Sequence, residues 1–247
     1  MLLDFHKIHV NQNWFVRETA SPLFVRVYYV LSGTVTYTDA HTRTMLKKDH
    51  VYLFPTAIPY TMEQDRNDRL YCVYLHLDIL PDLIDEIVSF DCQAHPIVQA
   101  VFKAIDSAIV RGKSSAQPLV DSLSEVLLTY ADQCGKIRKN TQGLGQAVSY
   151  IAMHFSEEIT VERLSTLCGY HEKYFIRVFS EVFGLSPYQY LIHYRLNRSC
   201  YLLKAGLSVT ETAYACGYKD AKSYCRAFHK MFGISPGTYG SSKWIVP

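Results

Sequence analysis

Short apolar runs separated by turn residues dominate the first third of the chain, from about residue 8 to residue 78. The runs are rich in valine, tyrosine, phenylalanine and threonine, which favour strands over helices. They cover residues 24–31, 34–38, 50–54 and 70–79. Polar and turn-forming residues separate them, as in Ser32-Gly33 and the segment 63–68. Many short strands at this spacing predict a small β-barrel or a β-sandwich.

The pattern becomes helical beyond about residue 81. Residues 96–110 and 117–134 place apolar side chains three and four positions apart, as one face of a helix requires. Pro96 and Pro118 fit the first turn of these two helices, where the missing amide hydrogen of proline costs nothing. A helical segment therefore follows the predicted strands.

A polar, basic stretch with a glycine at each end, residues 135–143, is predicted to be a linker. The fold class that follows is α+β with two domains. The first, over residues 1–134, contains the strands and the helical segment. The second, over residues 144–240, is all-α.

One sequence pattern occurs twice in the second predicted domain. Residues 169–190 read GYHEKYFIRVFSEVFGLSPYQY, and residues 217–239 read GYKDAKSYCRAFHKMFGISPGTY. The copies are 48 residues apart at their first glycines and 49 apart at Arg177 and Arg226. Each copy places a glycine turn between a short helix and a longer one, which is the arrangement of a helix-turn-helix unit.

Helix-start and helix-stop residues define the predicted helices. Thr160, Ser186 and Ser208 can cap helix N-termini, and glycines can end helices in the left-handed conformation. The predicted helices cover residues 144–155, 161–168, 172–183, 187–205, 209–216 and 221–232. The helix that joins the two units has about 19 residues and is therefore about 28 Å long.

Two such units at a fixed distance suit double-stranded DNA. Adjacent turns of the major groove are about 34 Å apart, so a stiff connector could present one helix to each of two grooves. The charge is also unevenly distributed: residues 141–247 contain 11 Lys/Arg and 7 Asp/Glu, whereas residues 1–140 contain 14 and 16. The simpler alternative is two helix pairs that only pack together, but the repeat, the connector and the charge favour an anionic partner.

The composition is that of a globular protein, with 49% hydrophobic and 19% charged residues among 247. No apolar run is long enough for a transmembrane helix, and no signal-peptide pattern opens the chain. We therefore expect a cytoplasmic protein with no membrane partner. The seven cysteines form no Cys-x-x-Cys pair, which favours free, mostly buried thiols.

Several C-terminal motifs resemble the AraC/XylS family of bacterial transcription regulators. Arg-x-Phe, which follows Tyr-Phe-Ile in the first copy and Tyr-Cys in the second, and Phe-Gly-x-Ser-Pro occur in both copies, and Tyr-Leu-x-x-x-Arg-Leu occurs in the connector. The resemblance covers residues 144–240. It implies a sequence-specific regulator that binds promoter DNA and works with RNA polymerase, without a cofactor and without enzymatic activity. Activation is the usual outcome in the family, although these residues do not separate activation from repression.

The N-terminal part more loosely resembles the cupin-like sensor domain of the same family. The stretches Tyr-Val-Leu-Ser-Gly (29–33) and Leu-Lys-Lys-Asp-His (46–50), followed by Phe54-Pro55, carry this resemblance. It implies a small-molecule effector and a homodimer formed through the helices within 96–134. Thr212 departs from the family pattern, which has an apolar residue there. Because its hydroxyl can bond the carbonyl four residues earlier, we expect a tolerated substitution in the core.

Matching the family's base-contacting positions to the two copies gives candidate DNA-reading residues. They are Lys173, Ile176 and Arg177 in the first unit and Ala221, Lys222, Cys225 and Arg226 in the second. Arginine can bond guanine with two hydrogen bonds, lysine can reach a base edge or a phosphate, and small apolar side chains can pack on a thymine methyl group. Phosphate contact or simple solvation is the alternative for each arginine. Tyr174 and Tyr224 are expected on the buried faces.

Polar residues inside the apolar strands are candidate effector ligands. By strand alternation Arg26 shares a face with Tyr28, and Tyr74 shares a face with His76. An inward arginine would suit a carboxylate or a phosphate on the ligand. One alternative is that these four residues lie on the solvent face of a half-exposed sheet, and another is that the domain only dimerises.

A cupin-like fold also raises the hypothesis of a metal-dependent enzyme, which would need clustered histidine and carboxylate ligands. Metal-binding cupins usually carry a His-x-His motif, and His6 and His9 do not form one. Tyr60 stands where a later histidine ligand is expected. The sequence therefore predicts no metal site.

Overall fold

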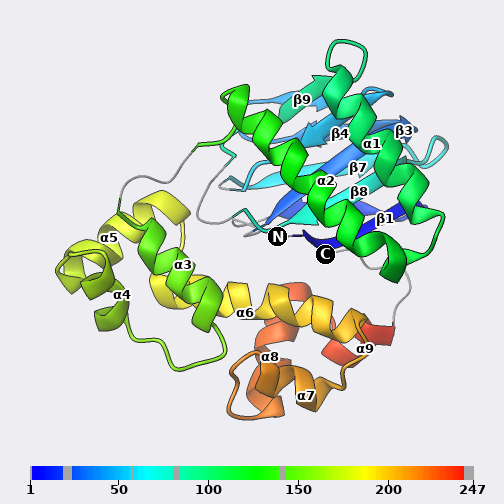
Figure 1. Cartoon of the computed structure of the whole chain (residues 1–247). Helices are drawn as coiled ribbons and strands as arrows, with labels where there is room; N and C mark the ends of the chain where they lie inside the picture. Colours follow the sequence, from blue (N-terminus) through cyan, green and yellow to red (C-terminus); the bar gives the residue numbers. More distant parts are fainter. Residues whose placement is uncertain (1, 19–23, 57, 80–83, 139–142, 242–247) are drawn as a thin grey trace. The chain divides into compact units, whose positions relative to one another are not determined.

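The structure is a computed structural model that describes residues 2–18, 24–56, 58–79, 84–138 and 143–241. The chain divides into two compact units, Met1–Lys139 and Asn140–Pro247 (Figure 1). Within the predicted linker, residues 139–142 lie outside the described residues.

The described part of the first unit contains two antiparallel sheets. The five-stranded sheet has the order β1-β8-β3-β6-β9, and the four-stranded sheet has the order β2-β7-β4-β5. The strands are β1 (Leu2–His9), β2 (Phe15–Glu18), β3 (Val25–Ser32), β4 (Val35–Thr38), β5 (Arg43–Met45), β6 (His50–Leu53), β7 (Tyr60–Gln64), β8 (Tyr71–Leu77) and β9 (Val88–Asp91). The two sheets enclose an interior that contains residues from both.

The four predicted apolar runs all form strands, namely β3, β4, β6 and β8. Strand β7 extends to Gln64 and so enters the segment 63–68, which was wrongly predicted to be a turn throughout. Its inward side chains, Tyr60 and Met62, are buried, while Glu63 is exposed. Every second residue of β7 is therefore at least partly exposed. These positions are polar, so the end of the strand resembles a turn in the sequence.

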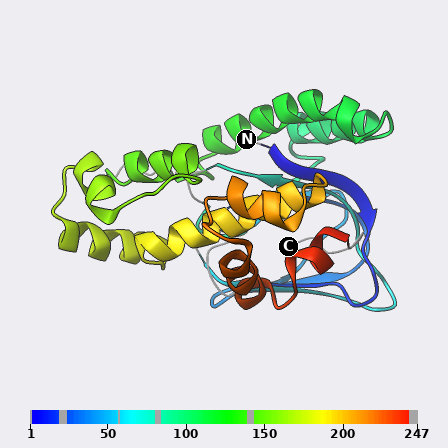
Figure 2. The ribbon, with the colours of Figure 1, turned by 90° about the horizontal axis from the view of Figure 1, so that it is seen from below.

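Two helices, α1 (Pro96–Ile109) and α2 (Lys113–Gln133), lie side by side and cover the outer face of the five-stranded sheet (Figures 1 and 2). Val27 and Leu75 of the sheet belong to one buried apolar cluster with Phe102 and Ile105 of α1 and Leu127 of α2. The opposite face of the same strands looks toward the four-stranded sheet. This arrangement decides which residues of β3 and β8 face the interior.

Pro96 is at the first position of α1, as predicted, but Pro118 is not in the first turn of its helix. Helix α2 begins at Lys113, so Pro118 lies inside it. The amide of Ala116 donates to the carbonyl of Gly112 and closes a turn ahead of the proline. Proline then removes only its own hydrogen bond, and the helix continues through it.

The second unit consists of helices within its described residues: α3 (Gly145–His154), α4 (Val161–Leu167), α5 (Glu172–Phe183), α6 (Pro187–Lys204), α7 (Val209–Ala215), α8 (Ala221–Phe232) and α9 (Pro236–Ser241). The predicted bounds of α5 and α8 are confirmed to the residue. Helix α6 has 18 residues, which corresponds to about 27 Å. Helices α4 and α5 lie at one end of α6, and α7 and α8 lie at the other (Figure 1).

The helix ends follow the predicted capping residues. Thr160, Ser186 and Ser208 each accept a hydrogen bond from a backbone amide in the first turn of α4, α6 and α7. Gly184 and Gly233 end α5 and α8 with φ of 67° and 73°, a conformation that glycine adopts without strain. None of the helices within the described residues is long and apolar enough to span a bilayer.

Thr212 lies in the core, as expected, but its hydroxyl does not make the hydrogen bond to the carbonyl four residues earlier. Its side chain is 0% exposed, and its hydroxyl has no hydrogen-bond partner among the described residues. The carbonyl of Ser208 accepts the backbone amide of Thr212 at 2.9 Å instead. The helix is therefore regular here, and a polar oxygen is buried without compensation.

Candidate DNA-binding surface and effector site

Helix α5 packs on α6 through aromatic rings on one face. Phe175, Phe179 and Phe183 are four residues apart and buried, so they form a continuous stripe along the helix. The ring centroid of Phe179 lies 5.2 Å from that of Tyr190 on α6. This packing holds α5 in a fixed orientation and leaves its opposite face to solvent.

The three candidate residues of α5 lie away from this stripe. Lys173 and Arg177 are exposed, and Ile176 is partly buried. A terminal nitrogen of Arg177 donates to Oε1 of Glu181 at 2.9 Å, and its guanidinium lies 5.1 Å from the ring centroid of Tyr174. Tyr174, which we expected to be buried, is 47% exposed because its ring lies along the outer side of the helix with Arg177.

Helix α8 repeats this arrangement in the second helix-turn-helix unit. Tyr224 and Phe228 are buried, as expected for Tyr224, and the ring centroid of Phe228 lies 5.5 Å from that of Tyr239 on α9. Asp220 caps the helix, since one carboxylate oxygen accepts the amide of Ser223 at 2.7 Å and the other its hydroxyl at 2.8 Å. The start of α8 is therefore held more firmly than that of α5, whose cap residue His171 makes no side-chain cap bond.

The four candidate residues of α8 also lie at the surface. Lys222 and Arg226 are exposed, and Ala221 and Cys225 are partly buried. Each unit therefore presents a cationic outer face with small or apolar positions beside it. Arginine and lysine donors beside apolar groups are suited to a base edge or a phosphate in the major groove.

The candidate effector residues meet inside the first unit. In the register of β3 and β8, Arg26 is opposite His76 and Tyr28 is opposite Tyr74. All four are buried, with Arg26 1% and His76 0% exposed. The alternative of a half-exposed sheet is therefore wrong, because the four-stranded sheet covers this face. The alternation of residues along β3 and β8 predicted that each pair shares a face of the sheet. It did not predict that the four-stranded sheet covers that face.

Arg26 is already paired. Its guanidinium lies 2.5 Å from a carboxylate oxygen of Glu18, donates to the hydroxyl of Tyr60 at 3.0 Å, and lies 4.7 Å from the ring centroid of Phe24. Burial alone would lower the pKa of Arg26, but the Glu18 carboxylate and the tyrosines raise it above its ordinary value. Burial also raises the pKa of Tyr60 to about 12. Only Nε of Arg26 lacks a partner among the described residues.

His76 has an unpaired imidazole. Neither ring nitrogen has a hydrogen-bond partner among the described residues, and the ring centroid of Phe24 lies 4.8 Å away. Burial, with a further contribution from the charge of Arg26, lowers the pKa of His76 to about 3. The imidazole is therefore neutral near pH 7 and offers one donor and one acceptor. Buried polar atoms without partners are uncommon and need an explanation such as a ligand.

Tyr74 connects this interior to α2. Its hydroxyl donates to Asp4 at 3.0 Å, and the other oxygen of Asp4 pairs with Lys113. Burial opposes ionisation of Asp4, but neighbouring positive charge and these hydrogen bonds lower its pKa. Asp4 and Glu18 were not among the predicted site residues, because both lie on strands, β1 and β2, that the sequence pattern did not indicate.

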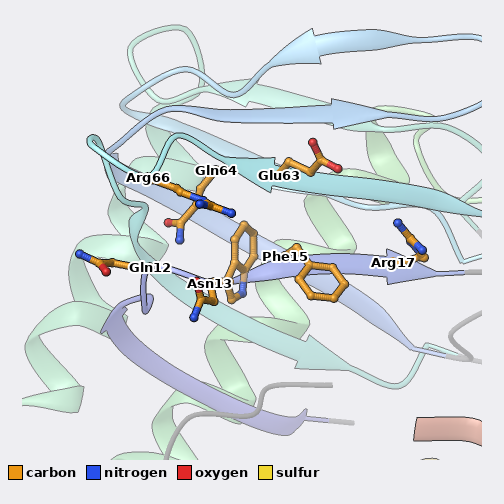
Figure 3. A pocket seen from close by; sticks show the side chains of 8 residues that line it. Gln12, Asn13, Phe15, Arg17, Glu63, Gln64 and Arg66 are labelled. Carbon is orange, nitrogen blue, oxygen red and sulfur yellow. The ribbon is translucent and has the colours of Figure 1, made fainter. Parts of the chain in front are cut away.

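A separate open groove of about 350 Å³ lies on the outer side of β2 and β7. It is lined by Gln12, Asn13, Trp14, Phe15, Arg17, Glu63, Gln64 and Arg66 (Figure 3). Gln12, Asn13 and Gln64 lie toward one end, and Arg17 lies at the other (Figure 3). The ring centroid of Trp14 is 6.3 Å from that of Tyr28, so this residue borders both the groove and the interior. No sequence motif indicated the groove.

Among the described residues, no group of three or more histidine, cysteine or acidic side chains is arranged to hold a metal ion. The described cysteines are free, and three of the seven are not buried.

Comparison with known proteins recovers both units. Residues 3–131 match the family described as AraC-like ligand binding domain, and residues 164–242 match the family described as Helix-turn-helix domain. The HTH-type transcriptional activator RhaS of Salmonella schwarzengrund is 30% identical over 244 residues, which cover 94% of this chain and 84% of that protein. An uncharacterised HTH-type regulator of Haemophilus influenzae is 27% identical over 180 residues, covering 68% of this chain and 56% of that protein.

The crystal structure of ToxT from Vibrio cholerae is similar in fold, with a TM-score of 0.68, 11% identity and 96% coverage of each chain. The fold and the two sites define a two-domain helix-turn-helix protein with a cupin-like N-terminal domain. The chain belongs to the AraC family. It spans 34%, 56% and 37% of the length of three other curated members that it matches.

Proposed function

We propose that this protein is a cytoplasmic transcription regulator that binds specific promoter DNA through residues 144–240. Residues 1–134 bind a small-molecule effector and form a homodimer, and residues 135–143 link the two parts. The protein acts by binding and not by catalysis, with RNA polymerase as its partner at the promoter and activation as the outcome. The named activator RhaS among its relatives supports that last point.

The observation that carries the proposal is the duplicated surface of the second unit. Helices α5 and α8 each bury an aromatic stripe and expose lysine and arginine at matched positions. They belong to units at opposite ends of one 18-residue helix. A connector of about 27 Å suits two adjacent major grooves, whose separation is about 34 Å. In this arrangement Lys173, Arg177, Lys222 and Arg226 donate to bases or phosphates, while Ile176, Ala221 and Cys225 pack beside them.

The effector binds between the two sheets of the first unit in this proposal. The interior is lined by Arg26, Tyr28, Tyr74 and His76. Nε of Arg26 and both ring nitrogens of His76 have no hydrogen-bond partner among the described residues. The charges are already matched, Arg26 with Glu18 and Asp4 with Lys113. An uncharged ligand with hydrogen-bond donors and acceptors therefore fits better than the carboxylate or phosphate suggested by the sequence, because an anion would compete with Glu18 for Arg26.

Footprinting of the full-length protein on DNA selected from a random library tests the DNA-binding part. We expect two protected major-groove segments about one helical turn apart and an affinity that falls steeply between low and moderate salt. Scrambling either protected segment supplies the control. Absence of any sequence preference over competitor DNA at both salt concentrations would refute the proposal.

A ligand screen tests the effector part. We expect an uncharged polar compound to raise the melting temperature of the wild type and to change the fluorescence of Trp14, which is near Tyr28. His76→Phe keeps an aromatic ring but removes both nitrogens, so this variant should lose the response. If the same compound stabilises His76→Phe as strongly, it does not bind at the interior, and the alternative that the domain only dimerises gains support.

A further inference from the structure

The two helix-turn-helix units are joined by a second contact besides the length of α6. The loop between α3 and α4, next to the first helix-turn-helix unit, passes close to the turn between α7 and α8 in the second helix-turn-helix unit. A Cβ placed on Gly217 in that turn would lie 2.5 Å from the carbonyl oxygen of Ser156 in the loop. It would also lie 2.9 Å from a terminal nitrogen of Arg195. The backbone of the α7–α8 turn therefore lies against the backbone of the α3–α4 loop, and any side chain larger than that of glycine would clash with it.

Arg195, near the middle of α6, holds the same loop. Its Nε donates to the carbonyl of Phe155 at 2.6 Å, and Nη2 donates to the carbonyl of Glu157 at 2.7 Å. Its guanidinium lies 5.9 Å from the ring centroid of Tyr218, the residue after Gly217. One side chain thus contacts the loop of the first unit and the turn of the second at once. The planar, forked guanidinium can do this, whereas a point donor such as lysine cannot match both carbonyls equally well.

The sequence repeat supplies an internal comparison for this contact. Gly169 occupies the position in the first unit that Gly217 occupies in the second, and both have positive φ, 68° and 75°. A Cβ placed on Gly169 would meet no described atom within 4 Å beyond its own turn. Both glycines are needed for the turn, but only Gly217 is also needed for a close approach between the units.

We propose that Arg195 and Gly217 form an inter-unit clamp, which fixes the position of α8 relative to α5 so that both helices can enter DNA together. Its effect on DNA recognition rests on the function proposed above. Without the clamp, only α6 and the apolar cluster that packs α7 and α8 on it would set the offset, and the α7–α8 turn would lose its attachment to the loop between α3 and α4. Binding at two grooves would then lose the advantage of a preorganised pair, whereas binding at one groove would be unchanged.

Affinity measurements on two DNA duplexes test the consequence for recognition. One duplex contains both protected segments, and the other has the segment read by α8 scrambled. We expect Arg195→Ala and Gly217→Ala to reduce the ratio of the two affinities about tenfold, and Arg195→Lys to reduce it less. Gly169→Ala is the matched control, because it imposes the same positive φ on alanine without the clash, and it should keep the wild-type ratio. A wild-type ratio in both Arg195→Ala and Gly217→Ala would overturn the proposal.

Amide hydrogen exchange of the full-length variants without DNA supplies the second arm. Arg195→Ala should speed exchange in residues 155–158 and 216–219 by about tenfold or more, since both segments lose their mutual support. Gly169→Ala should leave these two segments unchanged. If the wild type shows no specific DNA binding, the proposed function fails, and exchange alone decides whether the units are clamped. Unchanged exchange in both segments of a folded Arg195→Ala variant would overturn the clamp.

Discussion

The helices of the two helix-turn-helix units are equal in length, but the polar side chains that cap them differ. Helices α4 and α7 have 7 residues each, and α5 and α8 have 12 each. Thr160 caps α4 alone, whereas Ser208 and Glu211 form a reciprocal capping box on α7. The recognition helices differ in the same direction, because Asp220 caps α8 and no side chain caps α5. Caps of this kind each stabilise a helix start, so the second unit is the better preorganised one.

The recognition arginines differ as well. Arg177 bonds Glu181 and lies over Tyr174, whereas Arg226 is exposed and makes no hydrogen bond or ion pair with any described residue. If both arginines contact DNA as proposed, Arg177 must give up its hydrogen bond to Glu181, whereas Arg226 gives up only the attraction of its charge to nearby Asp220. A repeated motif therefore determines the position of an arginine on the helix, but neighbouring residues determine how freely that arginine can contact DNA.

Removing the two arginines one at a time should give the largest difference between the units. We expect Arg226→Ala to weaken specific binding by about 2 kcal/mol, with relaxed specificity at one base position. Arg177→Ala should cost less, because its interaction with Glu181 offsets part of the gain. Affinity for the selected operator and for single-base variants measures both. Lys230→Ala is the control: this exposed lysine of α8 is not among the candidate base-reading residues, and a lysine that contacts only phosphate should weaken all sequences alike when it is removed. An equal or larger loss for Arg177→Ala would remove the proposed difference.

A stabilising substitution tests the buried hydroxyl of Thr212, which has no hydrogen-bond partner among the described residues. Thr212 corresponds to the buried Leu164, which lies 48 residues earlier in the first unit. Thr212→Val keeps the shape and removes the unpaired hydroxyl, so we expect the free energy of unfolding to rise by about 1 kcal/mol. Urea unfolding measures it, with the exposed Thr210→Val as the control that should change little. A destabilised Thr212→Val would mean that the hydroxyl has a partner.

The cap of α8 should make a smaller, pH-dependent contribution. The amide and hydroxyl of Ser223 lower the pKa of Asp220 below its ordinary value of 3.8. A carboxylate whose pKa is lower in the folded state stabilises the fold above its unfolded pKa and loses that effect as pH falls through the folded value. Asp220→Ala should therefore destabilise the protein near pH 7 and differ less and less from wild type below about pH 4. Thermal unfolding across pH measures this, and His171→Ala, at the uncapped start of α5, should have little effect at any pH.

The smallest effect should come from freeing Arg177. Glu181→Gln removes an exposed pair of the kind that contributes about 0.3–0.5 kcal/mol in a helix. We expect DNA affinity to rise about twofold, since Arg177 no longer has to give up the carboxylate. A double-mutant cycle is the check, because Glu181→Gln should give no such gain in an Arg177→Ala background. The same gain in that background would show that Glu181 acts by its charge alone.

The sequence predicted the C-terminal half of the chain, Asn140–Pro247, far better than the N-terminal half, Met1–Lys139. The reason is that helix ends depend on nearby residues, whereas strands depend on distant ones. Caps and left-handed glycines are local, so α5 and α8 were predicted to the residue from Gly184, Gly233 and the repeat. The strands of the first unit depend on pairing between distant segments. Strand β1 pairs with β8, some 70 residues away, and its apolar residues do not alternate regularly with polar ones, so its own sequence does not distinguish it from a loop.

The sites show the same division. Outward positions on α5 and α8 follow from helical periodicity, and the candidate residues there are all at the surface. Arg26 and His76 were placed on one face correctly, but their burial depends on the second sheet. The contact of Arg195 with two carbonyls 38 and 40 residues earlier leaves no pattern in the sequence at all.

The head-to-tail duplication along α6 also gives the molecule a direction. The first unit offers Lys173, Ile176 and Arg177, and the second offers a different set that includes Lys222 and Arg226. If these residues contact bases as proposed, two unlike units in a fixed order read an asymmetric sequence, and a single chain lies on its operator in one orientation only. A palindrome is then unnecessary for each chain, and inverting the site would turn the whole protein around relative to the start of transcription.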